Sequence, residues 1–225
     1  MPATEFKVEA QAVHQDGRVS ARLVGSPGVD VRPGHMFSGY RPGHDWHCHT
    51  LVPIALSASG FSVLLPEAAD WPPGATLVLR GPMGNGFSPP ESSRRWLLIA
   101  FGDADLYLHP LVAWGLANGR AVAFVSDRQT HKLPPAVEVL TDPEDGLAWA
   151  DYIAIGMPFD RLDSLSVQMR DDAWRMRSLT QDDLLVVGPT PCGIGGCQAC
   201  ALEGQGARRL FCVDGPMFRL PDIRT

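Results

Sequence analysis

The cysteines near the end of the sequence constrain this chain more than any other feature. Cys192, Cys197 and Cys200 follow a C-x4-C-x2-C spacing, and Cys212 comes after eleven further residues. Four thiolates are the ligands of a two-iron, two-sulfur cluster, with two sulfurs for each iron. The glycines of PCGIGGCQAC (residues 191–200) allow positive φ, so that backbone N–H groups can turn toward the sulfurs and tune the cluster. The sequence therefore predicts a 2Fe-2S cluster on these four cysteines.

Other interpretations of the cysteines fit this pattern less well. Structural zinc favours paired C-x2-C units rather than three cysteines within nine residues. Disulfides are disfavoured in compartments where thiols stay reduced. Free structural cysteines normally lie among apolar neighbours, whereas these lie among glycines. A zinc-stabilised interaction module stays open as an alternative of a different class.

Charge and hydropathy argue against several kinds of partner. The formal net charge is -6, so the chain lacks the basic footprint that nucleic-acid backbones require. No run reaches the roughly 18 consecutive apolar residues of a membrane span. The first residues, MPATEFKVEAQAV, lack the basic-then-apolar layout of a signal peptide. We therefore expect a cytoplasmic protein with no nucleic-acid partner and no membrane span.

Turns and apolar runs divide the chain into three predicted domains of an α+β protein. Residues 1–88 contain short apolar runs between Gly and Pro turns, which indicates an antiparallel β-barrel. Residues 89–188 alternate buried-strand runs with helical patterns, which indicates an α/β domain with a mainly parallel sheet. Its helices are expected at LHPLVAWGLANG (residues 108–119) and FDRLDSLSVQMRDD (residues 159–172). Residues 189–225 are the predicted cysteine-bearing domain.

Three segments of the chain together resemble one protein family. PCGIGGCQAC, RLFCVDGPMF (residues 209–218) and GPMGNGF (residues 81–87) are similar to the electron-transfer subunit of class 1B dihydroorotate dehydrogenase, in the ferredoxin-reductase-like superfamily. The resemblance implies an FAD-binding barrel, a central nicotinamide-binding domain and a C-terminal domain whose 2Fe-2S cluster is held by the four cysteines. It also implies that electrons pass from NADH through FAD and the cluster to a separate catalytic flavoprotein subunit.

The flavin motif of the family is altered in this chain. Relatives carry an Arg-Pro-x-Ser stretch that contacts FAD, and the matching segment LVPIALS has Val52 for the arginine and Ala55 for the serine. Pro53 and Ile54 remain as candidate flavin contacts. Valine cannot supply the forked hydrogen bonds of an arginine to phosphate. PEAADW (residues 66–71) also lacks the Gly-rich turn and helix N-terminus that hold the pyrophosphate in relatives, so we expect FAD binding to be weakened or lost.

The segment GPMGNGF contains the other candidate flavin-site residues, Gly84, Asn85 and Gly86. A Gly-rich connector between the barrel and the α/β domain is the alternative interpretation of this segment. Because the other flavin motifs are altered, both interpretations stay open.

The nicotinamide site is altered as well. Relatives have a Gly-rich turn after the first strand of this domain, where the backbone approaches a dinucleotide phosphate. Here Gly102 remains, but Asp103 and Asp105 follow it and place negative charge near the phosphate. At the end of a later strand, IGMPFDRL keeps Gly156 and lacks the cysteine of the family. We expect NAD to bind weakly or not at all.

The predicted function is electron transfer. We expect a 2Fe-2S subunit that relays electrons to or from a flavin- or metal-containing catalytic oxidoreductase subunit in a hetero-oligomer. The redox chemistry belongs to the cluster, and the protein positions and tunes it. A complete reductase subunit that uses FAD and NADH is the alternative.

The segment GHDWHCHT is a second candidate metal site, with His44, His47, Cys48 and His49 close together. On a strand, His47 and His49 would share one face, and two imidazoles so placed could ligate zinc. The alternatives are a polar turn with one hydrogen-bonded histidine, or a segment that fills the space of the flavin. Sequence alone leaves these interpretations open.

Overall fold

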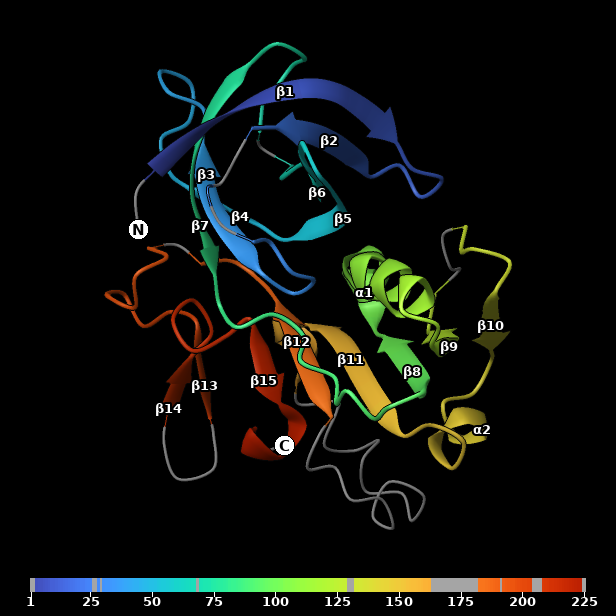
Figure 1. Ribbon diagram of the computed structural model, residues 1–225. Coiled ribbons are helices and arrows are strands. Elements are labelled where there is room, and N and C mark those ends of the chain that lie inside the picture. Colours follow the sequence, from blue (N-terminus) through green and yellow to red (C-terminus); the bar gives the residue numbers. More distant parts are fainter. Residues whose placement is uncertain are drawn as a thin grey trace.

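The computed structural model describes residues 3–25, 28, 30–67, 69–128, 132–162, 182–190, 192–203 and 208–223. Figure 1 shows an antiparallel sheet in the upper part of the molecule and a second sheet with its helices below it. The segment that carries the four cysteines lies beside the second sheet and below the first.

The first sheet is formed by the N-terminal part of the chain. Its strands are β1 (Ala3–Val13), β2 (Val19–Val24), β3 (Met36–Tyr40), β4 (His49–Leu51), β5 (Pro53–Ser57), β6 (Gly60–Leu64) and β7 (Thr76–Met83). All pairings are antiparallel, in the order β4-β3-β7-β1-β2-β6-β5. The edge strands β4 and β5 are separated only by Val52, so the chain joins the two ends of a strongly curved sheet (Figure 1). The expected antiparallel unit is present, and its closure into a barrel stays a prediction.

Aromatic side chains form the core of the first sheet. Phe6, Phe37, Phe61 and Trp71 are each 1% exposed. Phe37 and Phe61 stack with ring centroids 4.5 Å apart. β1 was not among the apolar runs that predicted strands, because most of its side chains face solvent.

The second sheet is mainly parallel, as expected. Its strands are β8 (Arg95–Ala100), β9 (Ala121–Ser126), β10 (Val137–Leu140), β11 (Tyr152–Pro158), β12 (Asp183–Val187) and β15 (Met217–Arg219). The order is β10-β9-β8-β11-β12-β15, and only β15 pairs antiparallel. Leu97 and Ile99 belong to one buried cluster, whereas Leu98 and Ala100 belong to a second one. Successive residues are therefore buried on opposite faces, which explains the uninterrupted apolar run of β8.

Few residues are helical among those described. The helices are η1 (Gly102–Ala104), α1 (Asp105–Ala117), α2 (Glu144–Leu147), η2 (Phe159–Arg161) and η3 (Leu220–Asp222). α1 contacts both the second sheet and β5 (Figure 1), so it buries side chains on two sides. The helix predicted at 108–119 is present but begins at Asp105. Of the helix predicted at 159–172, only η2 and the residue after it are described, because positions 163–172 lie outside the described residues.

The cysteine-bearing segment packs onto the second sheet. It contains a two-stranded hairpin of β13 (Ala201–Glu203) and β14 (Arg208–Leu210). The chain then returns, and β15 pairs with β12 with Leu184 opposite Phe218. The domain boundaries after residues 88 and 188 stay predictions.

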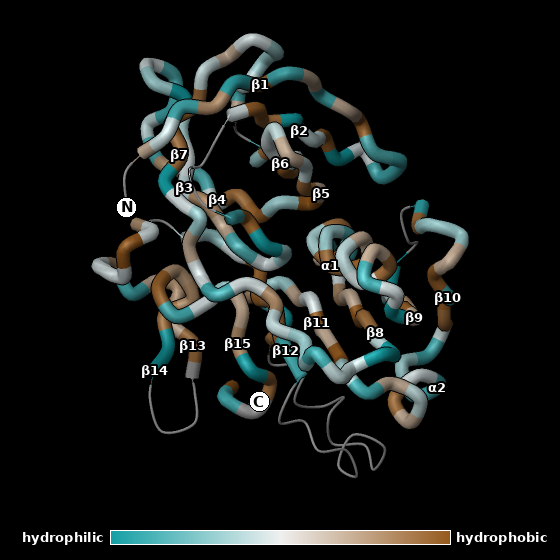
Figure 2. The backbone as a smooth tube through the Cα atoms, in the orientation of Figure 1, coloured by the Kyte–Doolittle hydropathy of each residue, from teal (hydrophilic) through white to brown (hydrophobic). Residues whose placement is uncertain are grey.

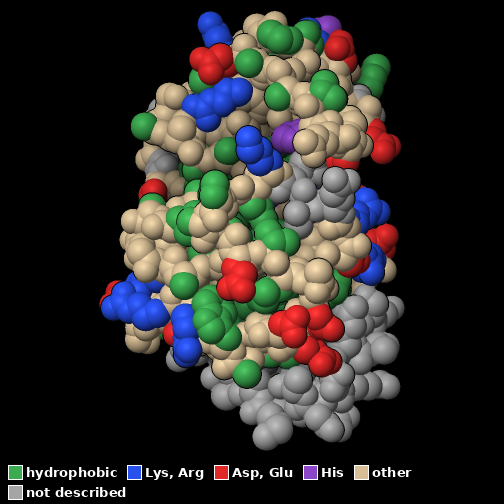
Figure 3. All heavy atoms as spheres, turned by 90° about the vertical axis from the view of Figure 1, so that its right-hand side faces the viewer, with side chains coloured by type: hydrophobic (Ala, Val, Ile, Leu, Met, Phe, Trp, Pro, Cys, Tyr) green, Lys and Arg blue, Asp and Glu red, His purple; other side chains and the backbone are tan. Residues whose placement is uncertain are grey.

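Hydropathy and charge are distributed as in an ordinary folded domain. Figure 2 shows hydrophobic residues along β8 and β11 in the interior, whereas the turn between β1 and β2 is hydrophilic. Both Lys and Arg side chains and Asp and Glu side chains are scattered over the part of the face that Figure 3 colours. None of the helices within the described residues has the length and apolar character needed to cross a bilayer.

Candidate metal centre and cofactor sites

The loop from Cys192 to Cys200 curls around its own thiols. Gly193 and Gly195 have φ of +62° and +76°, a region that favours glycine. The Cys197 N–H group donates to Cys192 Sγ at 3.4 Å. This hydrogen bond, together with one from the Ile194 N–H group, lowers the pKa of the Cys192 thiol to about 6. The loop thus favours a thiolate at Cys192, as the glycines predict.

The other two cysteines of the pattern, Cys200 and Cys212, contact each other. Cys200 and Cys212 are buried, and the Cys200 thiol donates to Cys212 Sγ at 3.1 Å. Burial and the neighbouring Cys200 thiol raise the pKa of Cys212 to about 12, while the Gly195 N–H group opposes this rise. Backbone donors from one loop therefore reach sulfurs of both pairs.

The four predicted ligands come together as two pairs. Cys192 and Cys197 form one hydrogen-bonded pair near the surface, and Cys200 and Cys212 form the buried pair. Within the described residues, no three or more His, Cys, Asp or Glu side chains are grouped so that they could hold one metal ion. Two pairs of thiols match the needs of two irons, whereas a single zinc ion needs all four ligands around one centre. The four thiols are thus a donor set that fits a 2Fe-2S cluster.

The altered flavin motif lines a small cavity of about 460 Å³. Its walls come from β4 and the residues before it, from α1 and from the chain after β12; they are His47, Cys48, His49, Thr50, Val52, Pro66, Tyr107, Val187, Gly188, Pro189 and Thr190. Val52 is 4% exposed and belongs to the core cluster of the second sheet. These walls include no Lys or Arg, so they offer no cation for a flavin pyrophosphate.

Pro53 and Ile54 do not line this smaller cavity. Both are buried at the start of β5, and Ile54 instead lines the larger cavity on the other side of that strand. Their role as flavin contacts stays a prediction.

The turn that contains Gly84, Asn85 and Gly86 packs closely against other segments of the chain. A Cβ atom at Gly84 would lie 2.3 Å from the Gly215 carbonyl oxygen, and one at Gly86 would lie 3.0 Å from the Pro33 oxygen. Both glycines have positive φ, at +82° and +66°. These contacts give the turn a packing role between the first sheet and the cysteine-bearing segment.

The carboxyl ends of the parallel strands, where a dinucleotide would bind, are covered by the protein's own charged side chains. The Gly102 N–H group donates to Asp127 Oδ1 at 2.8 Å. Asp105, at the N-terminus of α1, forms an ion pair of 2.8 Å with Arg18 from the turn between β1 and β2. Arg161 pairs with the other oxygen of Asp127 at 2.6 Å. The donors that would hold a phosphate thus already have carboxylate partners.

Sequence reasoning found part of this charged group and missed the rest. Asp103 and Asp105 were identified as obstacles to phosphate. Asp127 was missed, although its position just after β9 places it at the same edge as Gly102. No sequence signal pointed to Arg18, which comes from the first sheet and reaches Asp105 across 87 positions of the chain.

The histidine-rich segment forms an anchored turn. His44, His47 and Cys48 are exposed, whereas His49 is 8% exposed in β4. His47 and His49 do not lie on one strand, because β4 begins at His49. Their rings nevertheless lie 4.5 Å apart.

The buried carboxylate of Asp45 holds this turn. It accepts hydrogen bonds from the Arg41 N–H group at 2.6 Å and from Trp71 Nε1 at 2.8 Å, and it lies 3.8 Å from His49 Nε2. Burial lowers the pKa of His49, Asp45 opposes this effect, and His47 adds to it. These contacts favour the hydrogen-bonded turn over a metal site.

The curved antiparallel sheet and the parallel sheet follow each other as in a class of solved reductase structures, and the cysteine loop comes after them. Two structures of this class illustrate the likeness. A solved NADH-dependent reduced ferredoxin-NADP oxidoreductase has 18% identity and a TM-score of 0.75, covering 97% of this chain and 89% of that chain. Phthalate dioxygenase reductase has 12% identity and a TM-score of 0.57, covering 92% of this chain and 75% of that chain. At these identities the likeness shows the fold.

Sequence comparisons narrow this class. Residues 191–224 match the family model of the iron-sulfur cluster binding domain of dihydroorotate dehydrogenase B. A protein of Thermoplasma acidophilum, named "Probable dihydroorotate dehydrogenase B (NAD(+)), electron transfer subunit", is 25% identical over 224 residues, covering 87% of this chain and 82% of its own length. The chain is thus similar to these electron-transfer subunits, which confirms the resemblance seen in its motifs.

Proposed function

We propose that this protein is an electron-transfer subunit that carries a 2Fe-2S cluster on Cys192, Cys197, Cys200 and Cys212. It relays electrons to or from a catalytic oxidoreductase subunit in a hetero-oligomer. The arrangement of the four thiols in two pairs within reach of backbone N–H donors supports this proposal most directly. The proposal includes a reducing compartment such as the cytoplasm, where cysteines stay available as metal ligands.

The chain's contribution is to hold the cluster and to connect it with the surface. When bound, the cluster supplies one-electron redox chemistry. The N–H groups of Cys197 and Gly195 compensate negative charge on the sulfurs, which adjusts the potential. Cys200 and Cys212 are buried, whereas Cys197 is exposed, so a cluster held by these residues would be approached by a partner protein from the Cys197 side.

The proposal includes weakened or lost binding of FAD and NAD. Val52 and the uncharged walls of the small cavity provide no anchor for a pyrophosphate. Asp127 and Asp105 occupy the donors at the nucleotide edge. The fold is that of FAD-binding reductases, but the residues at both sites do not fit these cofactors, so we derive no step through them.

Elemental and flavin content of the chain tests the function. Protein purified without oxygen should contain iron and sulfide in equal amounts, about two of each per chain, with a rhombic paramagnetic signal after reduction. Acid-released flavin should be far below one per chain. Stoichiometric FAD would favour the complete FAD- and NADH-using reductase, and zinc without iron would favour the interaction module.

Cysteine variants supply the matched control. Cys197→Ser should lose most of the iron and the visible absorbance, because one iron loses a thiolate. Cys48→Ser should keep both, since the exposed Cys48 lies outside the loop. Equal iron content in the two variants would contradict the ligand assignment.

A further inference from the structure

A second and larger cavity is unused by the proposed electron-transfer function. It has a volume of about 1090 Å³ and shares no lining residue with the small cavity beside the cysteine loop. Its walls come from residues 30–33, from β5, from residues 87–91, from α1 and from residues 132–134. A volume near the upper end of the range for small-molecule sites suits a ligand of drug or nucleotide size.

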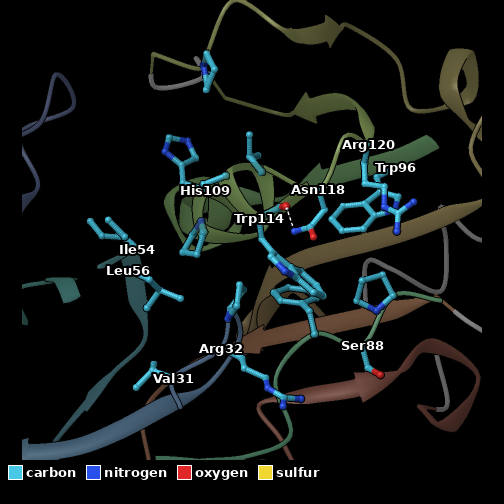
Figure 4. A pocket seen from close by; sticks show the side chains of 18 of the residues that line it. Val31, Arg32, Ile54, Leu56, Ser88, Trp96, His109, Trp114, Asn118 and Arg120 are labelled. Atoms are coloured by element: carbon cyan, nitrogen blue, oxygen red, sulfur yellow. Dashed lines mark hydrogen bonds between the residues drawn. The ribbon is translucent and has the colours of Figure 1, made fainter. Parts of the chain in front are cut away.

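The middle of this cavity is apolar and aromatic. Trp114 reaches from α1 across the cavity toward Arg32, with Ile54 and Leu56 on one side and Asn118 and Arg120 on the other (Figure 4). The Trp114 side chain is 39% exposed although it is large and apolar. An aromatic face that stays open in a concave site favours the stacking of a flat ring.

Contacts with Trp96 and Asn118 hold Trp114 in place. Its ring lies 5.6 Å from that of Trp96, which is 2% exposed and donates its indole N–H to Ser93 Oγ at 2.8 Å. Asn118 Nδ2 donates to the Trp114 carbonyl oxygen at 2.8 Å. The aromatic wall is therefore preformed, which lowers the entropy cost of binding.

Arg120 also lines this cavity, and only part of the hydrogen-bonding capacity of its guanidinium group is used. One of its nitrogens, Nη2, donates to the Glu91 carbonyl oxygen at 3.1 Å. Nε and Nη1 are buried and have no hydrogen-bond partner within the described residues. Burying charged donors without acceptors is costly, and the fork of a guanidinium suits a carboxylate or a phosphate.

Charges at the rim of the cavity have both signs. Arg32 and Lys132 line it, as do Asp30 and Glu91. Arg32 pairs with Asp30 at 3.3 Å, and both side chains are mostly exposed. Among the described residues of the site, Arg120 is the cation that has buried nitrogens and no carboxylate partner.

We infer that this cavity binds an organic anion with a flat aromatic body, whose carboxylate or phosphate group is held by Arg120 and whose ring lies against Trp114. The site is separate from the proposed cluster and from the nucleotide edge of the second sheet. Aromatic carboxylates and nucleoside monophosphates share this chemistry, and the experiment below separates them.

Two fluorescent probes that differ in charge test the site. Anilinonaphthalene sulfonate has a flat body and an anionic group, whereas N-phenyl-naphthylamine has the same body without the charge. The intact chain should bind the sulfonate with saturable fluorescence. Arg120→Gln should weaken sulfonate binding at least about tenfold and leave the neutral probe unchanged, because only the charged interaction is lost. Trp114→Ala should weaken the binding of both probes.

Controls keep this outcome decisive. Arg208→Gln removes an exposed arginine whose partner is Gln198, so it should leave both affinities unchanged. Circular dichroism of each variant reports its fold. If Arg120→Gln does not fold, Arg120→Lys replaces it in the test. Lysine keeps the charge without the fork, so this variant should bind the sulfonate with intermediate affinity. Equal sulfonate affinity of the intact chain and the Arg120 variants would overturn the inference.

Competition identifies the class of ligand. Adenosine monophosphate and indole acetate are added separately to the chain saturated with the sulfonate probe. Displacement by the first indicates a nucleotide, and displacement by the second indicates an aromatic carboxylate. Failure of both to displace the probe at millimolar concentration would also overturn the inference.

Discussion

At the scale of single residues, His49 shows how burial decides the role of a histidine. The side chain is 8% exposed, packs edge-on against Trp71 with ring centroids 5.4 Å apart, and lies near Asp45. His44 and His47 belong to the same sequence cluster, yet both face solvent. The three clustered histidines therefore have different environments, one in the interior and two at the surface.

His49 should make stability depend on pH. Burial lowers its pKa below the ordinary histidine value of 6.5, so the unfolded chain binds a proton more readily than the folded chain. The free energy of unfolding should therefore fall as the pH drops through 6.5, and the loss should stop below the folded pKa. Urea unfolding at a series of pH values measures this slope.

His49→Gln should flatten that slope, because glutamine does not titrate. His44→Gln serves as the matched control, since it removes an exposed imidazole from the same segment. His35, whose pKa is lowered mainly by burial, should leave a smaller slope in the variant. A slope identical in His49→Gln and the intact chain would show that His49 does not contribute.

At the scale of elements, a buried carboxylate on β12 joins β11, β15 and the connection between the two sheets. Asp183 accepts hydrogen bonds from Tyr152 Oη at 2.7 Å, from Arg219 Nη1 at 2.9 Å and from the Ser88 N–H group at 3.0 Å. Burial raises the pKa of both Asp183 and Tyr152. Because each donor comes from a different element, Asp183 fixes β15 onto the sheet.

Removing this acceptor should cost more stability than removing one donor. Asp183→Ala leaves the buried Tyr152 hydroxyl and two further donors without an acceptor and should lower the free energy of unfolding by about 3 kcal/mol. Tyr152→Phe removes one hydrogen bond and should cost about 1 kcal/mol. Tyr40→Phe, at a partly exposed site, is the control. Equal losses in the first two variants, measured by chemical unfolding, would contradict the network.

At the scale of the whole molecule, charged side chains cover the edge where the sheets meet. Arg18 from the first sheet donates to the Asp103 carbonyl oxygen and pairs with Asp105, each at 2.8 Å. Asp127 and Arg161 extend this group along the ends of β9 and β11. The group couples the two halves of the molecule and lies at the carboxyl ends of the parallel strands, the edge at which such sheets bind ligands.

This charged edge should prevent tight binding of NADH. Titration of the intact chain with NADH, followed by tryptophan fluorescence, should show no saturation below about 1 mM, the upper end of ordinary Michaelis constants. Carboxylates near the phosphate site repel it, and the Gly102 N–H group is already bonded to Asp127. A dehydrogenase that binds NADH serves as the positive control. Saturation at micromolar concentration would contradict the loss of the nicotinamide site.

Sequence by itself determined those features of this protein that depend on neighbouring residues. The spacing of Cys192, Cys197 and Cys200 with intervening glycines sets a loop of thiols, and the apolar runs set the parallel strands. Loop geometry and strand type follow from short-range backbone preferences, so they can be derived from local patterns.

Only the tertiary structure decided which distant groups meet. Asp127 reaches Gly102, and Arg18 crosses from the turn between β1 and β2 to α1. The packing of β15 against β12 and the cavity around Arg120 and Trp114 are also products of the assembled fold. Such contacts depend on how whole sheets and helices pack, and no spacing along the chain specifies that packing.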